Sequence, residues 1–258
     1  MTYVWYSIKR GYGLTLNNTT NCRMHTKQRY TVQAEPPRRK VGMTRRSVSG
    51  IYLFRGRTPI AFESTLERDF LIRLEADRSV LEVVSQPLTL RYRINGREHA
   101  YTPDYLVHYR QAYGGRNHLP SELIEVKPKE VLARKLVQWK PKFRAATRYC
   151  LDKGFVFRLM HEDRIRDHVW ENMRFLARYR KIAVDKELSA LMLDTVRSLG
   201  CMTFRQLVDA CCFSKWGVHG KAHGIAVAWH LVVMGALECD LIEPLSNDTM
   251  IWVPDNER

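Results

Sequence analysis

The sequence has no long hydrophobic run, and several familiar motifs are missing from it. No stretch of about 18 or more apolar residues occurs, which excludes a membrane-spanning helix, and the first ten residues lack the apolar core of a signal peptide. No Gly-x-x-x-x-Gly-Lys segment is present, so any ATP hydrolysis must come from another subunit. The sequence also contains no internal repeat and no low-complexity block.

Cysteine is sparse, and its six positions form no close-spaced framework. Scattered cysteines in a chain of 258 residues indicate reduced thiols and a cytoplasmic setting, which we expect to be that of a prokaryotic cell. His219 and His223 lie near Cys211 and Cys212, which suggests a zinc site. No Cys-x-x-Cys accompanies them and glycines interrupt the helix they would share, so we favour buried structural thiols.

Acidic residues are nearly absent from the first part of the chain. Before Glu63 twelve bases face Glu35 alone, a net charge of +11; residues 63–180 carry +7, and the remainder, from Lys181, carries −3. The total of +15 favours a polyanionic partner, because nucleic acid releases counterions on binding a basic surface. DNA affinity is therefore expected in the first 180 residues and a protein partner for the C-terminal part. The alternative is a basic protein that is merely soluble.

Residues 1–50 combine aromatic and basic side chains without a sustained period. They are interpreted as an extended basic arm. Such an arm can follow a DNA backbone and stack aromatic rings on bases. The competing interpretation is a poorly ordered basic tail.

A helix is expected next, because apolar residues recur at every fourth position from Phe62 to Leu74. Ser64 and Glu67 have the spacing of a capping box. The helix therefore begins at Ser64 or slightly before Glu63, and the sequence leaves this boundary open.

The middle of the chain predicts a sheet with a long helix. The Asn95-Gly96 pair is a strong signal for a two-residue hairpin turn. Pro141 predicts a kink or break in the helix. This order of elements is typical of an α/β core with a mixed sheet. The expected strands cover residues 80–85, 88–94, 97–102, 104–109, 122–127 and 155–160, and the expected helix covers residues 129–150.

After a connecting helical stretch at residues 167–180, the C-terminal part predicts a second unit. Its first helix ends at Gly200, Thr203 caps a second, and a third covers residues 223–235. Two short extended segments then flank a turn at residues 246–248. Three helices followed by a hairpin describe a small α+β winged-helix domain.

Two carboxylates and one amine are placed where metal-dependent phosphodiester chemistry needs them. Side chains alternate along a strand, so Glu125 and Lys127 share one face while Val126 turns to the opposite, buried side. Pro128 ends this strand because it cannot donate a backbone hydrogen bond. Asp104 follows a proline in extended chain, so its carboxylate can emerge at a strand end beside Glu125.

Hydrolysis of an anionic phosphodiester requires a cation, since carboxylates alone would repel the substrate. Asp104 and Glu125 provide the hard oxygen ligands that Mg²⁺ prefers, and bound Mg²⁺ promotes ionisation of water. Lys127 can orient or deprotonate the attacking water and oppose charge in the transition state. The alternative is a solvated aspartate beside a surface Glu–Lys pair.

Four segments in this order make the sequence similar to TnsA, the endonuclease subunit of a heteromeric transposase. The resemblance covers about residues 62–160, and the C-terminal winged-helix interpretation agrees with the second domain of that family. The segments are Phe62-Glu63-Ser64-Thr65-Leu66-Glu67-Arg68-Asp69-Phe70, Ser85-Gln86-Pro87, Tyr101-Thr102-Pro103-Asp104-Tyr105 and Ile124-Glu125-Val126-Lys127-Pro128.

The resemblance implies a restriction-endonuclease-like α/β domain over residues 51–180, between the arm of residues 1–50 and a winged-helix domain of residues 181–258. Glu63 on the helix, Asp104 and the backbone carbonyl of Val126 would hold Mg²⁺, for which Mn²⁺ can substitute, and Lys127 would be the catalytic amine. Some relatives carry Gln in place of Glu125, which leaves open whether Glu125 binds the metal directly or tunes Lys127. The candidates for DNA binding are the basic residues Arg55, Arg57, Lys129, Arg134 and Lys135.

The implied function is cleavage of the 5′ ends of a transposon in double-stranded DNA. A partner transposase of the integrase type, TnsB-like, would cut and join the 3′ ends. A TnsC-like AAA+ ATPase would contact the C-terminal domain, and no membrane is involved. Two alternatives remain: a standalone restriction or repair nuclease that uses the same residues, and a non-catalytic DNA-binding adaptor.

Overall fold

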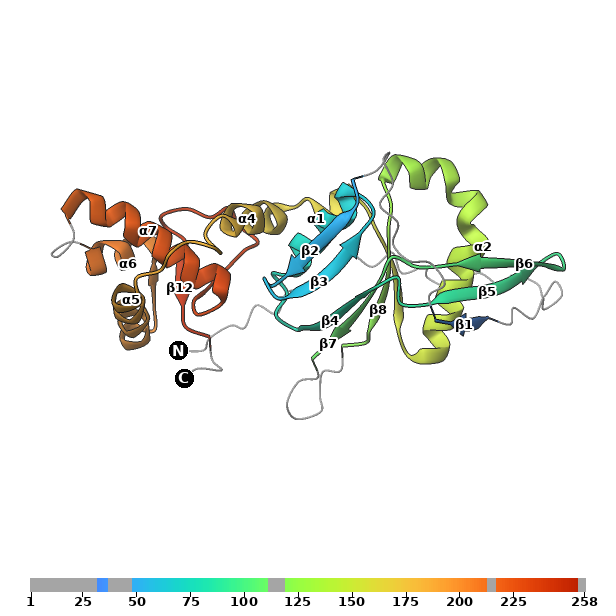
Figure 1. The fold of residues 1–258 in the computed structure, drawn as a ribbon, viewed down its shortest axis with the longest axis horizontal. Coiled ribbons are helices and arrows are strands. Elements are labelled where there is room, and N and C mark those ends of the chain that lie inside the picture. The colour runs from blue at the N-terminus through green and yellow to red at the C-terminus, as the bar shows by residue number, and fades with distance from the viewer. Residues whose placement is uncertain (1–31, 37–47, 111–118, 213–216, 255–258) are drawn as a thin grey trace, which may run out of the picture. The chain divides into compact units, whose positions relative to one another are not determined.

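The computed structural model describes residues 32–36, 48–110, 119–212 and 217–254. Its centre is a mixed four-stranded sheet in the order β4-β7-β8-β9. Figure 1 labels β4, β7 and β8 of this sheet. The first three strands pair antiparallel, whereas β9 runs parallel to β8. The predicted mixed sheet is therefore confirmed. These strands are β4 (Val80–Ser85), β7 (Tyr105–Tyr109), β8 (Glu122–Val126) and β9 (Val156–Met160).

Helices cover both faces of this sheet because its buried strands are apolar on both sides. Ile124 and Val126 belong to the cluster that contains the apolar side of α1 (Thr65–Leu74), while Leu123 packs in the cluster of α2 (Lys129–Lys153). The side-chain alternation of β8 thus sends neighbouring residues to opposite helices. Pro141 was expected to kink or break the helix. It lies inside α2, which continues past it to Lys153, so the helix is not broken.

A second, smaller sheet adjoins this core in the order β1-β5-β6. Asn95 and Gly96 have φ of 48° and 77°, and they form the predicted hairpin turn between β5 (Thr89–Ile94) and β6 (Arg97–Tyr101). β1 (Gln33–Glu35) pairs with β5, so this part of the expected arm is a sheet strand. Residues 1–31 and 37–47 of the arm lie outside the described residues.

One hairpin was not predicted, and it corrects the expected start of the helix. β2 (Gly50–Phe54) pairs antiparallel with β3 (Thr58–Phe62), so Phe62 is a strand residue. Gly50 faces Phe62 in this pair, and a Cβ at Gly50 would lie 2.9 Å from the Phe62 ring. The helix begins only at Thr65, because Ser64 is extended and caps it. Glu63 therefore precedes the helix, and the prediction that it lies on the helix is wrong.

The C-terminal part contains helices around a small antiparallel sheet in the order β10-β12-β11. Thr203 caps α6 as predicted, since its Oγ1 accepts from the Gln206 N–H at 3.2 Å and Gln206 bonds back to the Thr203 N–H at 2.9 Å. The third helix starts at Gly217, earlier than predicted. The winged-helix assignment stays a prediction. The elements are α3 (Glu162–Ile165), α4 (His168–Ala177), α5 (Lys186–Leu199), β10 (Cys201–Thr203), α6 (Phe204–Cys212), α7 (Gly217–Met234), β11 (Glu238–Cys239) and β12 (Met250–Trp252).

Cys212 explains why helix α7 tolerates a glycine in its middle. A Cβ at Gly224 would lie 2.2 Å from Cys212 Sγ, so the thiol fills the space above the glycine. Five cysteines of the described chain are free thiols, and no group of three or more potential metal ligands occurs there. The side chain of His219 lies outside the described residues. No helix in these residues is both long and apolar enough to cross a membrane.

Candidate active site

Asp104 lies just before the start of β7, next to the end of β8. Its N–H donates to the Ile124 carbonyl at 3.1 Å, which places it directly before β7 and beside β8. Asp104 Oδ2 accepts hydrogen bonds from the Val126 N–H at 2.7 Å and from Lys127 Nζ at 2.9 Å. The expected meeting of Asp104 with the Glu-x-Lys strand is confirmed, and the carboxylate is fixed by both backbone and side chain.

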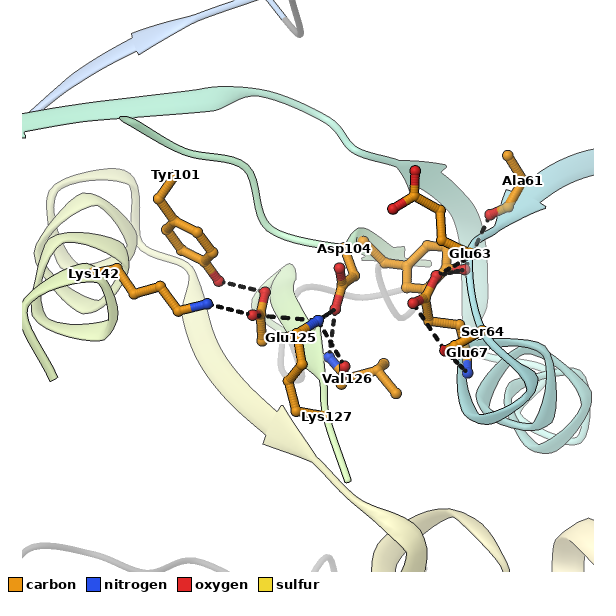
Figure 2. A network of polar contacts seen from close by, with 11 residues as sticks. Ala61, Glu63, Ser64, Glu67, Tyr101, Asp104, Glu125, Val126, Lys127 and Lys142 are labelled. Carbon is orange, nitrogen blue, oxygen red and sulfur yellow. Dashed lines mark hydrogen bonds and ion pairs between the residues drawn. The ribbon is translucent and has the colours of Figure 1, made fainter. Parts of the chain in front are cut away.

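Lys127 follows β8, and its ammonium connects the groups of the site (Figure 2). The Lys127 N–H donates to the Met160 carbonyl at 3.0 Å, which continues the pairing of β8 with β9. Its Nζ donates to Asp104 Oδ2 and to the Val126 carbonyl, both at 2.9 Å, and lies 3.4 Å from Glu125 Oε1. One ammonium is therefore shared by two carboxylates and a backbone carbonyl.

Glu125 is more deeply buried than its sequence pattern suggests. The residue is 1% exposed, because the face it shares with Lys127 is covered by α2. Tyr101 donates its hydroxyl to Glu125 Oε2 at 2.7 Å, and Lys142 Nζ donates to Oε1 at 2.8 Å. Both faces of the strand are thus buried at this point, not only the Val126 face, and the carboxylate is compensated by groups from other elements.

Glu63 is positioned by a capping box at the start of α1. Ser64 Oγ accepts from the Glu67 N–H at 3.1 Å, and Glu67 Oε2 accepts from the Glu63 N–H at 2.8 Å. Tyr105, the residue after Asp104, donates its hydroxyl to the Ala61 carbonyl at 3.0 Å. These contacts fix the backbone on either side of Glu63 and connect it to β7, which directly follows Asp104. Figure 2 shows Ala61, Glu63, Ser64 and Glu67 of this group.

Burial and shared charge shift the pKa values of the site. Burial, reinforced by the charge of Glu125, raises the pKa of Asp104 to about 7, although Lys127 and the Val126 N–H act in the opposite direction. Burial disfavours the Lys127 ammonium, but the charges of Asp104 and Glu125 outweigh it and raise the pKa of Lys127. Lys127 therefore carries a proton at neutral pH in the metal-free protein and can donate a hydrogen bond.

The oxygen atoms around the Lys127 ammonium suit a hard cation. Asp104 Oδ2 and the Val126 carbonyl, two of the ligands implied by the resemblance, already hold a positive charge in the form of Nζ. Carboxylate and carbonyl oxygens are the donors that Mg²⁺ prefers. No three acidic, imidazole or thiol side chains gather around one point in the described chain, so water and phosphate oxygens would have to complete the coordination of such an ion.

Arg55 and Arg57, two candidates for DNA binding, lie in and beside the turn between β2 and β3. The guanidinium of Arg55 donates to the carbonyls of Val80 and Asp77, both at 2.9 Å, which holds this turn against the end of α1. Arg57 is exposed. Arg55 therefore has a structural role in addition to the DNA contact predicted for it, whereas Arg57 is accessible to a partner.

The other three candidates for DNA binding lie in the first half of α2. Lys129 forms an exposed ion pair with Asp163. Arg134 pairs with Glu130 at 3.5 Å, and Lys135 Nζ lies 5.5 Å from the centre of the Trp139 ring. Such exposed contacts are weak and can be exchanged for phosphate. DNA binding by these residues stays a prediction.

Sequence reasoning missed three residues that hold the site together, namely Tyr101, Tyr105 and Lys142. Both tyrosines stand in the segment that suggested the family, and their spacing of three and one residues from Asp104 was the available signal. Lys142 comes from a helix that packs on the sheet, and no local pattern connects it to Glu125.

A mixed sheet between helices, with an aspartate before one strand and a Glu-x-Lys at the end of the next, is the arrangement expected of a restriction-endonuclease-like nuclease domain. Residues 77–162 match the family described as TnsA-like endonuclease N terminal. The resemblance to TnsA is thereby confirmed over this segment, which contains Asp104, Glu125, Lys127 and Lys142. Glu63 precedes the matched segment. No curated protein matches the chain.

Proposed function

We propose that this protein is a Mg²⁺-dependent DNA endonuclease subunit of a transposase, which hydrolyses the 5′, non-transferred strand at transposon ends. The observation that carries the proposal is the convergence of Asp104, the Val126 carbonyl and Lys127 within 2.9 Å contacts, inside a segment that matches a family of endonucleases. A net charge of +15 supports a DNA substrate.

Mg²⁺ bound by Asp104, the Val126 carbonyl and Glu63 would neutralise phosphate charge and favour ionisation of the attacking water. The residues of the chain then have separate roles. Asp104 is held in place by the Val126 N–H, and its carboxylate would bind the cation. Lys127, as an ammonium, orients the water or donates to a phosphate oxygen as negative charge develops there.

The C-terminal part packs around a hydrophobic cluster that also includes Met173 and Leu176 of α4. Its net charge of −3 from Lys181 onward suits a protein partner better than DNA. We propose that it has a winged-helix fold and contacts a TnsC-like AAA+ ATPase. An integrase-type, TnsB-like transposase would cut and join the opposite strand. Under this proposal two enzymes cut the two strands at a transposon end, since a single site of this kind cuts one strand at a time.

The test uses the full chain together with a partner transposase, Mg²⁺ and DNA that carries transposon ends, and it follows each strand separately. Asp104→Ala and Lys127→Ala should abolish 5′-strand cleavage and leave cutting by the partner intact. Asp152→Ala, at an exposed position of α2, is the control and should retain activity. If either active-site variant still cuts the 5′ strand, the assignment is wrong.

The cleavage assay and a calorimetric measurement separate the two alternatives. A standalone restriction or repair nuclease would cut without the transposase. A DNA-binding adaptor would bind DNA but show no heat of Mn²⁺ binding in calorimetry, and Asp104→Ala would then have no effect on metal affinity.

A further inference from the structure

Glu125 is surrounded by donors that belong to three different elements. Tyr101 at the end of β6 donates to Oε2 at 2.7 Å. Lys142 on α2 donates to Oε1 at 2.8 Å, and Lys127 lies 3.4 Å from the same oxygen (Figure 2). Glu125 is 1% exposed, and both of its carboxylate oxygens accept hydrogen bonds from neighbouring side chains. An aspartate or glutamate ligand of Mg²⁺ instead offers at least one oxygen to the ion.

Lys142 is confined at the position from which it reaches Glu125. Its side chain is 17% exposed, and Nζ lies 4.3 Å from the centre of the Trp139 ring, 4.7 Å from that of Tyr101 and 5.0 Å from that of Phe143. Aromatic faces attract a cation but cannot neutralise it. Glu125 supplies the opposite charge, so this ammonium and this carboxylate depend on each other.

We propose that Lys142 is a positioning residue of the active site, which together with Tyr101 fixes Glu125 as the anionic partner of Lys127 rather than as a metal ligand. This proposal rests on the proposed nuclease function, within which it assigns Glu125 the role of holding Lys127. Glu125 acts on the reaction through the Lys127 ammonium, and Asp104 remains the carboxylate of this strand pair that faces the cation.

The reason that Lys142 is needed is the balance of charge. Asp104 and Glu125 share the Lys127 ammonium, and Lys142 supplies the second positive charge of the group. Without Lys142, Glu125 would have Lys127 as its closest cation and would draw Nζ away from Asp104 Oδ2. Displacement of a catalytic group by a fraction of an ångström is enough to slow a reaction.

The first experiment measures single-turnover cleavage of the 5′ strand by the full chain with its partner transposase. Lys142→Met should slow cleavage by about 10- to 100-fold, as loss of a supporting group typically does, without changing the affinity for DNA. Lys142→Arg should recover part of the rate. Lys153→Met, an exposed lysine at the end of the same helix, should cut normally. Thermal unfolding checks that each variant folds, and Lys142→Gln replaces Lys142→Met if that variant does not.

A double variant tests whether Lys142 acts through Glu125. If it does, Glu125→Gln combined with Lys142→Met cuts as fast as the slower single variant, because both remove the same interaction. If the rate losses of the two single variants instead multiply in the double variant, the residues act independently and the proposal is wrong. Failure of the wild-type protein to cut would refute the nuclease function instead, and the two failures are thus distinguishable.

The second experiment does not depend on cleavage. Calorimetry with Mn²⁺ on the metal-free protein should show that Asp104→Asn weakens binding far more than Glu125→Gln does. Lys142→Met should not tighten Mn²⁺ binding. If it tightens binding, Lys142 competes with the metal for Glu125, and equal losses in Asp104→Asn and Glu125→Gln would likewise make Glu125 a ligand. Either result would overturn the proposal even if no cleavage is observed.

Discussion

Tyr105 donates its hydroxyl to the backbone carbonyl of Ala61 at 3.0 Å, and so connects the two chain segments that carry Asp104 and Glu63. Asp104 directly precedes Tyr105, and Glu63 follows Ala61 by two residues. The same hydroxyl lies 3.5 Å from Glu67 Oε2, which accepts from the Glu63 N–H. A single buried phenol thus determines how the start of α1 is placed beside β7.

Tyr105→Phe should therefore impair the active site more than it impairs the fold. Loss of the donor to Ala61 should lower the free energy of unfolding by about 1–2 kcal/mol, since the carbonyl loses its buried partner. Cleavage should fall further than this loss of stability explains, because Glu63 and Asp104 are no longer held together. Denaturant unfolding and single-turnover cleavage measure the two effects. Tyr149→Phe, whose ring packs on Phe155, is the control, and equal loss of activity in both variants would contradict the prediction.

The meeting of Asp104 with Lys127 could be predicted from the sequence because it depends on local rules. A proline before Asp104 keeps the chain extended, and alternation along a strand places Glu125 and Lys127 on one face. The two segments lie at neighbouring strands, because β7 and β8 pair antiparallel. The mixed sheet and α2 followed from patterns of the same kind.

Contacts that depend on packing could not be predicted in this way. Lys142 reaches Glu125 only because α2 covers the face of β8 that carries Glu125, and no periodicity shows which helix covers which face. The sequence of the β2–β3 hairpin lacks a regular alternation of apolar and polar residues. Gly56 lies in its turn, with φ of 71°. Phe62 has the spacing of a helix residue, but the cap at Ser64 overrides it.

Asp104 should make the stability of the metal-free protein depend on pH. The pKa of its carboxyl is raised from the ordinary 3.8 to about 7, so between these values the folded chain holds a proton that the unfolded chain has lost. Stability therefore falls as pH rises through this window. Asp104→Asn, which mimics the protonated form, should gain stability relative to the wild type between pH 5 and pH 8 by on the order of a few kcal/mol. Urea unfolding measures the free energy of unfolding of both proteins. If the difference between Asp104→Asn and the wild type stays constant from pH 5 to pH 8, the raised pKa of Asp104 is contradicted.

Metal binding should respond to the same proton in the opposite direction. A divalent cation requires the ionised carboxylate, so Mn²⁺ affinity should rise as pH increases through about 7. About one proton should be released when the ion binds below this pH, which calorimetry in two buffers of different ionisation enthalpy can measure. Asp104→Asn should abolish both the pH dependence and the proton release. If wild-type affinity is independent of pH, Asp104 is not the titrating ligand.

Arg180 and Glu75 form a buried ion pair whose loss should destabilise the protein strongly. Arg180 Nη2 lies 2.6 Å from Glu75 Oε2, and the Glu75 side chain is 2% exposed. Arg180→Ala leaves this carboxylate buried without its cation, so the free energy of unfolding should fall by about 3–5 kcal/mol. Arg148→Ala breaks an exposed pair with Asp152 and should cost less than about 1 kcal/mol. If Arg180→Ala and Arg148→Ala lose comparable free energies of unfolding, burial does not control the cost of breaking an ion pair.

Gly224 should resist replacement by alanine even though it lies inside a helix. Alanine normally stabilises a helix interior by about 1 kcal/mol relative to glycine. At this position the new Cβ would lie 2.2 Å from Cys212 Sγ, so Gly224→Ala should instead lower the free energy of unfolding by about 1–3 kcal/mol. Cys212→Ala removes the obstructing sulfur but leaves a void of its own. The double variant should therefore be more stable than either single variant, because the methyl group introduced by Gly224→Ala occupies the vacated space. Thermal and denaturant unfolding measure the stability of each variant. If the stability losses of the two single variants add in the double variant, the thiol of Cys212 is not the reason that Gly224 is required.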